Sequence, residues 1–287
     1  MHPAVAKTRD FVSEVIAEWQ KDDALTLGAA LAYYTIFSIA PLLVLAVAIA
    51  GLVFGRRAAE GQLVAQIQDA IGPSAAQMIE GMIARASKPA SGVVATVVSL
   101  LTMGFGASGM FGQLQSSLNK IWEVHGKTAG GFRGQVRRRT RAALMILGTG
   151  LLLLVSLGAS AALGLLHEVL KERFPVASVV LPFANTTLEF TVITGLFAMI
   201  YKMLPEIRIE WRDVWLGAVV TAFLFALGRE LIGLYLGRAG VTSVYGAAGS
   251  LVLLLLWIYY SAQLLFLGAE FTEVYSRRFG SRRTEQA

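Results

Sequence analysis

The sequence predicts an all-α, polytopic membrane protein with six transmembrane helices, amphipathic interfacial helices and both termini in the cytoplasm. Of its 287 residues, 55% are hydrophobic and only 15% are charged, and the mean hydropathy is +0.62. Six stretches each approach or exceed the ~20 apolar residues that cross a bilayer. We therefore expect one transmembrane domain over residues 24–275, with an amphipathic cytoplasmic helix over 1–23 and a basic cytoplasmic tail over 276–287.

The N-terminal segment 1–23 alternates charged and apolar residues. It lacks the apolar core of a cleavable signal peptide, so we expect it to remain in the mature protein as a helix. Such a helix lies on the membrane surface or on the helix bundle. Its apolar residues approximate one helical stripe: Val5, Val12, Val15, Ile16 and Trp19.

The six predicted spans follow in order. The first, 24–55, is uncharged over 32 residues. The other five are predicted at 93–111, 142–166, 176–201, 214–237 and 247–269. Pro41 lies in the middle of the first span and Pro182 in the fourth, and proline in a helix interior predicts a kink.

The loops indicate the orientation. Outside the spans, 17 Lys and Arg residues lie on the side that holds both termini and 7 on the other side. The positive-inside rule therefore places both termini in the cytoplasm. The outer loop 56–90 has two amphipathic stripes separated by Gly72-Pro73, which predicts two helices. A cytoplasmic stripe follows the second span at Phe111, Leu114, Leu118, Ile121 and Trp122, and we interpret all these stripes as packing faces rather than docking sites.

The second span carries small residues at four-residue spacing, Gly104, Ser108 and Gly112. This pattern favours close packing of two helices. The alternative is a break in the helix whose backbone lines a cavity. The glycines are not a phosphate-binding loop, because no Gly-Lys-Ser/Thr ending and no preceding soluble strand accompany them.

Several short motifs resemble those of the YihY/virulence factor BrkB family of bacterial inner-membrane proteins. In chain order they are Gly28–Pro41, Phe111–Trp122, Leu204-Pro205, Gly217-Ala218, Tyr245-Gly246, Trp257–Tyr260 and Gly268-Ala-Glu270. The resemblance covers nearly the whole chain. It implies six helices, a multi-pass location in the bacterial inner membrane, and envelope, lipid-related or transport roles. The family also carries the older label ribonuclease BN, which this sequence does not support.

Charged residues inside two apolar runs are the candidate functional site. Glu189 lies near the middle of the fourth span, with Asn185 one turn away on the same face, and Arg229 and Glu230 lie in the fifth span. Charges at this depth cost at least ~2.5–3.5 kcal/mol and usually face a protein interior or wet cavity. Because a short connection makes the two helices antiparallel neighbours, we predict a Glu189–Arg229 ion pair, with Glu230 facing elsewhere. The pair could handle an anionic substrate, or it could only fix the helix register.

Other classes of function are disfavoured. The chain has no cysteine and its three histidines are dispersed, so we expect no metal, no cofactor and no catalytic residues. The basic residues are in loops next to spans, which indicates an anionic membrane surface and not nucleic acid as the partner.

Three functions fit these features to different degrees. The internal charges favour a transporter or a protein that translocates lipid or anionic solute. The alternative is a structural or scaffolding protein for envelope assembly. An intramembrane hydrolase is third, because the spans lack histidine and a matching carboxylate pair. The partners are then the lipid bilayer and an anionic lipid or solute, and the oligomeric state is left open.

Overall fold

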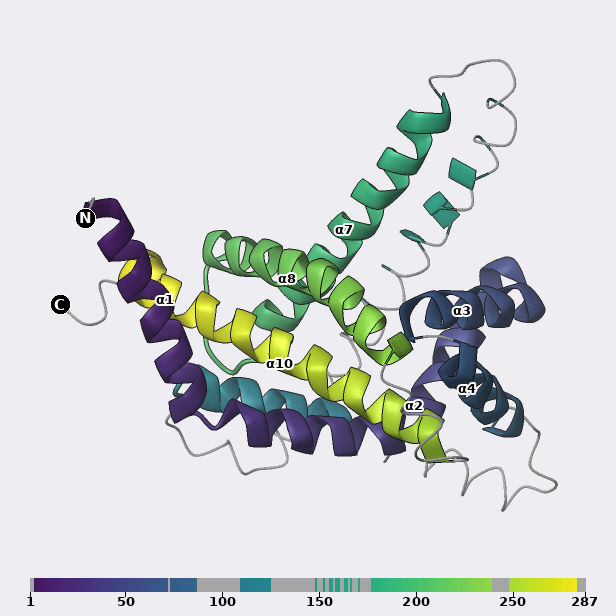
Figure 1. Ribbon diagram of the computed structural model, residues 1–287, viewed down its shortest axis with the longest axis horizontal. Helices are drawn as coiled ribbons and strands as arrows, with labels where there is room; N and C mark the ends of the chain where they lie inside the picture. Colours follow the sequence, from purple (N-terminus) through teal and green to yellow (C-terminus); the bar gives the residue numbers. More distant parts are fainter. Residues whose placement is uncertain are drawn as a thin grey trace.

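Every regular element that the computed structural model describes is a helix (Figure 1). The described residues are 3–71, 73–86, 109–124, 177–238 and 248–282, with single positions between 148 and 170. The helices are α1 (Pro3–Lys21), α2 (Ala24–Phe54), α3 (Arg56–Ile71), α4 (Pro73–Ala86), α7 (Ala177–Met203), α8 (Trp211–Arg238) and α10 (Gly249–Arg278). Residues 109–121 are also helical.

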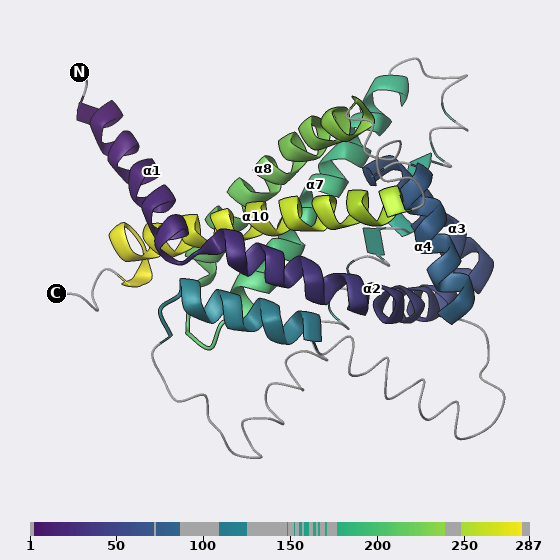
Figure 2. The same ribbon diagram turned by 60° about the horizontal axis from the view of Figure 1, so that its bottom comes forward.

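Helix α10 runs through the middle of the molecule (Figures 1 and 2). It packs against α8 and α2 along its length, and α7 packs against α8. Helix α1 contacts the C-terminal part of α10, whereas α3 and α4 lie at the opposite end of the molecule (Figure 1). The two ends are called the α1 end and the α3–α4 end below.

Three of the described helices are long and apolar enough to cross a membrane: Val180–Met203, Trp211–Ile232 and Gly249–Arg278. They confirm the existence of the predicted fourth, fifth and sixth apolar helices. Helix α2 covers 31 residues and agrees with the predicted first span. Most of the predicted second and third spans, with Gly104 and Ser108, fall outside the described residues. Six spans and their orientation therefore stay predictions.

The two prolines do not end their helices. The helical backbone of α2 continues through Pro41, and that of α7 continues through Pro182. The lost backbone donor of a proline leaves an acceptor one turn earlier, and each helix accommodates this within its length. The predicted kinks stay predictions.

The α3–α4 pair confirms the prediction for the outer loop. Helix α3 ends at Ile71 and α4 begins at Pro73, where proline is favoured because its fixed φ suits the first helical residue. Ile79 and Ile83 of the predicted stripe are buried in a cluster with Val47 of α2 and Leu254 of α10. The stripe is therefore a packing face.

The larger core lies toward the α1 end and joins α2, α7, α8, α10 and the 109–121 helix. Trp122, Tyr201 and Phe266 are its largest fully buried side chains. The predicted stripe of the 109–121 helix is confirmed as a packing face, because Leu114, Leu118, Ile121 and Trp122 are all buried in this core.

Helix α1 is present as predicted, but its contact face differs from the predicted stripe. Phe11 packs edge-on against Phe271 of α10, with ring centroids 5.3 Å apart. Val15 is buried, whereas Val12 and Ile16 are 48% and 46% exposed. The physical reason is that acidic residues of α1 pair with basic residues of α10, as described below, and this turns part of the apolar stripe away from the bundle.

Candidate functional site

The predicted Glu189–Arg229 ion pair does not form among the described residues. The guanidinium of Arg229 instead lies 3.4 Å from the carboxylate of Glu230, its neighbour in α8. Glu189 accepts a hydrogen bond from the amide of Asn185 at 2.9 Å. Glu230 is thus the partner of Arg229, which corrects the expectation that it faces elsewhere.

The register between α7 and α8 explains the difference. Tyr201 Oη lies 3.0 Å from Thr221 Oγ1, and the rings of Phe197 and Phe225 are 5.8 Å apart, one turn further along both helices. Continuing by another turn places Arg229 level with Ile193 and not with Glu189. Figure 1 also shows the N-terminal half of α7 projecting away from α8.

The N-terminal half of α7 has one polar patch. Its threonines donate to carbonyls of their own helix: Thr186 to Pro182, Thr187 to Phe183 and Thr191 to Thr187. Asn185 Oδ1 is buried and has no hydrogen-bond partner among the described residues. Asn185 Oδ1 is therefore an acceptor that no described donor satisfies, next to the carboxylate of Glu189.

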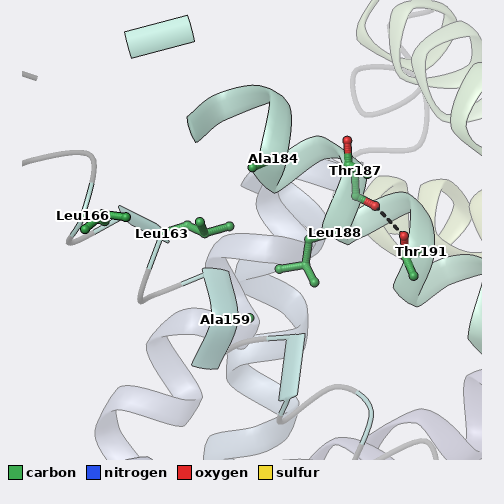
Figure 3. Close-up of a pocket in the computed structure, with 7 residues that line it drawn as sticks. All are labelled: Ala159, Leu163, Leu166, Ala184, Thr187, Leu188 and Thr191. Atoms are coloured by element: carbon green, nitrogen blue, oxygen red, sulfur yellow. Dashed lines mark hydrogen bonds between the residues drawn. The ribbon is translucent and has the colours of Figure 1, made fainter. Parts of the chain in front are cut away.

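An apolar pocket of about 630 Å³ lies on a neighbouring face of the same half-helix (Figure 3). Its lining residues are Ala184, Thr187, Leu188 and Thr191 of α7, together with Ala159, Leu163 and Leu166. In α7, Leu188 and Glu189 are adjacent, and their side chains are about 100° apart around the helix. This half-helix therefore combines an apolar pocket with a polar patch.

A buried polar network, which lies outside the candidate residues predicted from the sequence, joins α7, α8 and α10. Tyr201 Oη donates to the carbonyl of Leu265 at 2.8 Å and contacts Thr221 Oγ1. Gly268 makes room for this network, since a Cβ there would lie 1.8 Å from Thr221 Oγ1. Small residues recur at four-residue spacing in both α8 and α10: Gly217 and Thr221, then Gly268, Thr272 and Ser276. That spacing predicts close helix contact and could have located the network.

Charged residues gather at the α1 end. Arg277 of α10 binds Glu14 at 2.9 Å and Glu18 at 3.3 Å, both in α1. Arg278 also pairs with Glu14. The first arginines of the predicted basic tail thus belong to the last turn of α10 and attach α1 to it.

The turn between α1 and α2 completes this charged region. Asp23 adopts a left-handed conformation with φ of 56°, which aspartate tolerates better than most residues and which lets the chain change direction. Lys21 binds Glu18 at 2.7 Å and Glu123 at 3.0 Å, and these hydrogen bonds raise the pKa of Lys21. Burial raises the pKa of Asp22.

Within the described residues, no group of three or more His, Asp or Glu side chains is arranged to hold a metal ion. Gly112, the described member of the predicted small-residue stripe, is exposed, and no described atom beyond the adjoining part of its own helix lies within 4 Å of the position that a Cβ would take there. The predicted close packing at Gly112 thus finds no contact among the described residues.

Comparison with known proteins gives one consistent result. The chain is similar to proteins named UPF0761 membrane protein: it is 29% identical to one from Verminephrobacter eiseniae over 91% of this chain and 61% of that protein. It is 24% identical to one from Actinobacillus pleuropneumoniae over 91% and 92%, and 29% identical to one from Pseudomonas aeruginosa over 86% and 58%. The chain thus spans about three fifths of the length of several of these relatives. No solved structure matches it.

The family model described as virulence factor BrkB matches residues 15–287. These residues include the α1–α2 turn, the buried polar network and the membrane-length helices. This chain is therefore a membrane protein of the virulence factor BrkB family.

Proposed function

We propose that this protein translocates a lipid or another anionic amphiphile across the bacterial inner membrane. The proposal rests mainly on two charged residues in α8, a helix long and apolar enough to span a membrane. The side chains of Arg229 and Glu230 are 41% and 74% exposed. Charges on such a surface are costly against lipid tails, so they require a polar partner or a wet pathway.

The two faces of α7 favour an amphiphile over a small polar solute. The apolar pocket between α7 and residues 159–166 has a volume suited to a hydrocarbon chain. The Asn185–Glu189 patch on the neighbouring face can accept hydrogen bonds from hydroxyl or ammonium groups of a polar headgroup. A lipid places a chain and a headgroup next to each other in the same way.

Arg229 supplies the anion-binding group in this proposal. Its guanidinium can bind a phosphate or carboxylate oxygen through two parallel hydrogen bonds. Glu230 holds the guanidinium in the absence of substrate, and an arriving anionic headgroup replaces the carboxylate. Because the chemistry consists of binding and release, we propose no enzymatic activity.

A liposome assay tests the proposal. Purified protein is reconstituted with a trace of anionic phospholipid that carries a fluorophore on its acyl chain, and enzymatic or chemical quenching from outside reports exchange between leaflets. Wild-type protein should accelerate the exchange. The Arg229→Gln/Glu230→Gln variant should lower the rate by about tenfold or more, because a hydrogen bond to a charged group contributes ~1.5–3 kcal/mol.

The matched control is Glu210→Gln/Arg212→Gln, which neutralises an exposed pair of opposite charges at the start of α8 and should retain the wild-type rate. Wild-type protein that exchanges neither anionic nor zwitterionic lipid would contradict the proposal and favour the scaffolding alternative.

A further inference from the structure

Glu270 is a buried carboxyl group that pairs with no other side chain among the described residues. Its side chain lies in α10 and is only 1% exposed. Its Oε1 atom is buried and has no hydrogen-bond partner among the described residues. Burying an unpaired carboxylate costs far more free energy than burying a neutral group of the same size. The charge of Glu270 must therefore be neutralised by a proton or by a cation.

The contacts of two other residues of α10, one before and one after Glu270, show where its side chain lies. Gln263, Glu270 and Arg277 are seven residues apart and therefore share one face of the helix. Gln263 donates to the carbonyl of Ala24 in α2 at 3.2 Å, and Arg277 binds Glu14 in α1. Glu270 thus faces the junction between α1 and α2, at the α1 end of the molecule.

The charges around Glu270 are mostly negative. The charged side chains that act most strongly on the ionisation of Glu270 are the acids Asp22, Glu273 and Glu18 and the base Lys21. A like charge nearby disfavours ionisation of a carboxyl group. The three acids therefore add to the cost that burial imposes on an ionised Glu270.

The basic groups of this region bind other acceptors. Lys21 binds Glu18 and Glu123, and Lys120 of the 109–121 helix donates to the backbone carbonyl of Asp22. Arg277 is shared by three carboxylates, those of Glu14, Glu18 and Glu273. Among the described residues, no ion pair neutralises Glu270.

We propose that Glu270 is a proton-binding site: in this packed arrangement its carboxylate holds one proton taken from water at the α1 end of the molecule. Proton binding converts the carboxylate to a neutral carboxylic acid, so a buried negative charge disappears. A metal ion is not the expected ligand, because the described acids are not grouped to coordinate one. The proposal is independent of whether the protein translocates a lipid.

Infrared spectroscopy of the purified protein tests this site. The C=O stretch of a protonated carboxyl group is separate from the bands of carboxylates and amides. Wild-type protein at neutral pH should show a carboxylic acid band that corresponds to one group per chain and that shifts on transfer to D₂O. Glu270→Gln, which mimics the neutral form, should lose this band. The control Glu80→Gln, at an exposed position of α4, should retain it.

The proposal stays testable even if Glu270→Gln folds poorly, because the infrared spectrum of the wild-type protein alone can refute it. Absence of the acid band in wild-type protein at neutral pH, or an unchanged band in folded Glu270→Gln, would overturn the assignment. Specific stabilisation by sodium or potassium ions that Glu270→Gln abolishes would also overturn it, in favour of a metal cation.

Discussion

Gly268 gives the sharpest test of how α7, α8 and α10 fit together. In Gly268→Ala, the new Cβ would lie 1.8 Å from Thr221 Oγ1, 2.6 Å from Tyr201 Oη and 2.8 Å from Thr221 Cβ. Rotation of the Thr221 side chain cannot relieve the contact between the new Cβ and Thr221 Cβ, so α8 and α10 must move apart. The Tyr201 hydroxyl must also leave its position.

The expected cost follows from those two responses. Adding a methyl group to a well-packed site costs ~1–3 kcal/mol. Displacing the Tyr201 hydroxyl from the Leu265 carbonyl leaves a buried hydroxyl without its acceptor, which costs another ~1–3 kcal/mol. A total of ~2–6 kcal/mol corresponds to a melting temperature roughly 4–24 °C lower for a chain of this size.

Thermal unfolding in detergent, followed by circular dichroism, measures this effect. Gly61→Ala in α3 is the control, because no described atom beyond the adjoining part of its own helix lies within 4 Å of the position its Cβ would take. Alanine is favoured over glycine in helices, so this control should melt at or above the wild-type temperature. If Gly268→Ala melts like wild type, the tight contact among the three helices is refuted.

Three further predictions concern the α1 end and the topology. Arg277→Gln should detach α1 from α10, because Glu14 and Glu18 lose a shared cation. Limited proteolysis should then cut the α1–α2 turn faster than in the control Arg212→Gln, and equal cleavage rates would contradict this. Asp22→Asn should raise the melting temperature at neutral and alkaline pH but not at acidic pH. The folded-state pKa of Asp22 is raised, so stability from its protonated form is present at low pH and is lost as pH rises through that pKa; a pH-independent difference would argue against this. Reporter fusions after residues 80 and 240 should be found outside, and fusions at 130, 208 and 285 inside, whereas an outward C-terminus would overturn the predicted orientation.

Much of the helical architecture could be predicted from the sequence because its determinants are local. The Gly72-Pro73 break between two amphipathic stripes became the boundary between α3 and α4. The stripe from Leu114 to Trp122 became a buried face of the core, since residues three and four apart share a helix face. These patterns need no knowledge of the neighbouring helix.

The contacts of Arg229 could not be predicted in the same way, because they depend on the register between two helices. The sequence predicts a connection over 202–213, but α7 continues to Met203 and α8 already begins at Trp211. These small shifts of the helix ends do not set the register. The contacts of Tyr201 with Thr221 and of Phe197 with Phe225 set it, and they place Ile193 level with Arg229. A neighbouring carboxylate in the same helix, Glu230, is also within reach of the flexible arginine side chain.

Glu270 could not be predicted as a candidate for a different reason. In sequence it is an acidic residue just beyond an apolar run, where a charge normally faces water at the membrane boundary. The packing of other helices against α10 buries it. Burial of this kind is a long-range property, and no short sequence pattern carries it.

The length of α10 has a mechanical consequence. Its 30 residues form a continuous helix about 45 Å long. Near its start, Leu254 is enclosed by Ile79 and Val47, and near its end Arg277 is attached to α1. A helix is stiff along its axis, so an axial displacement at either end cannot be absorbed locally. An axial shift of α10 caused by a rearrangement of the α3–α4 hairpin would therefore strain the α1 contacts at the far end.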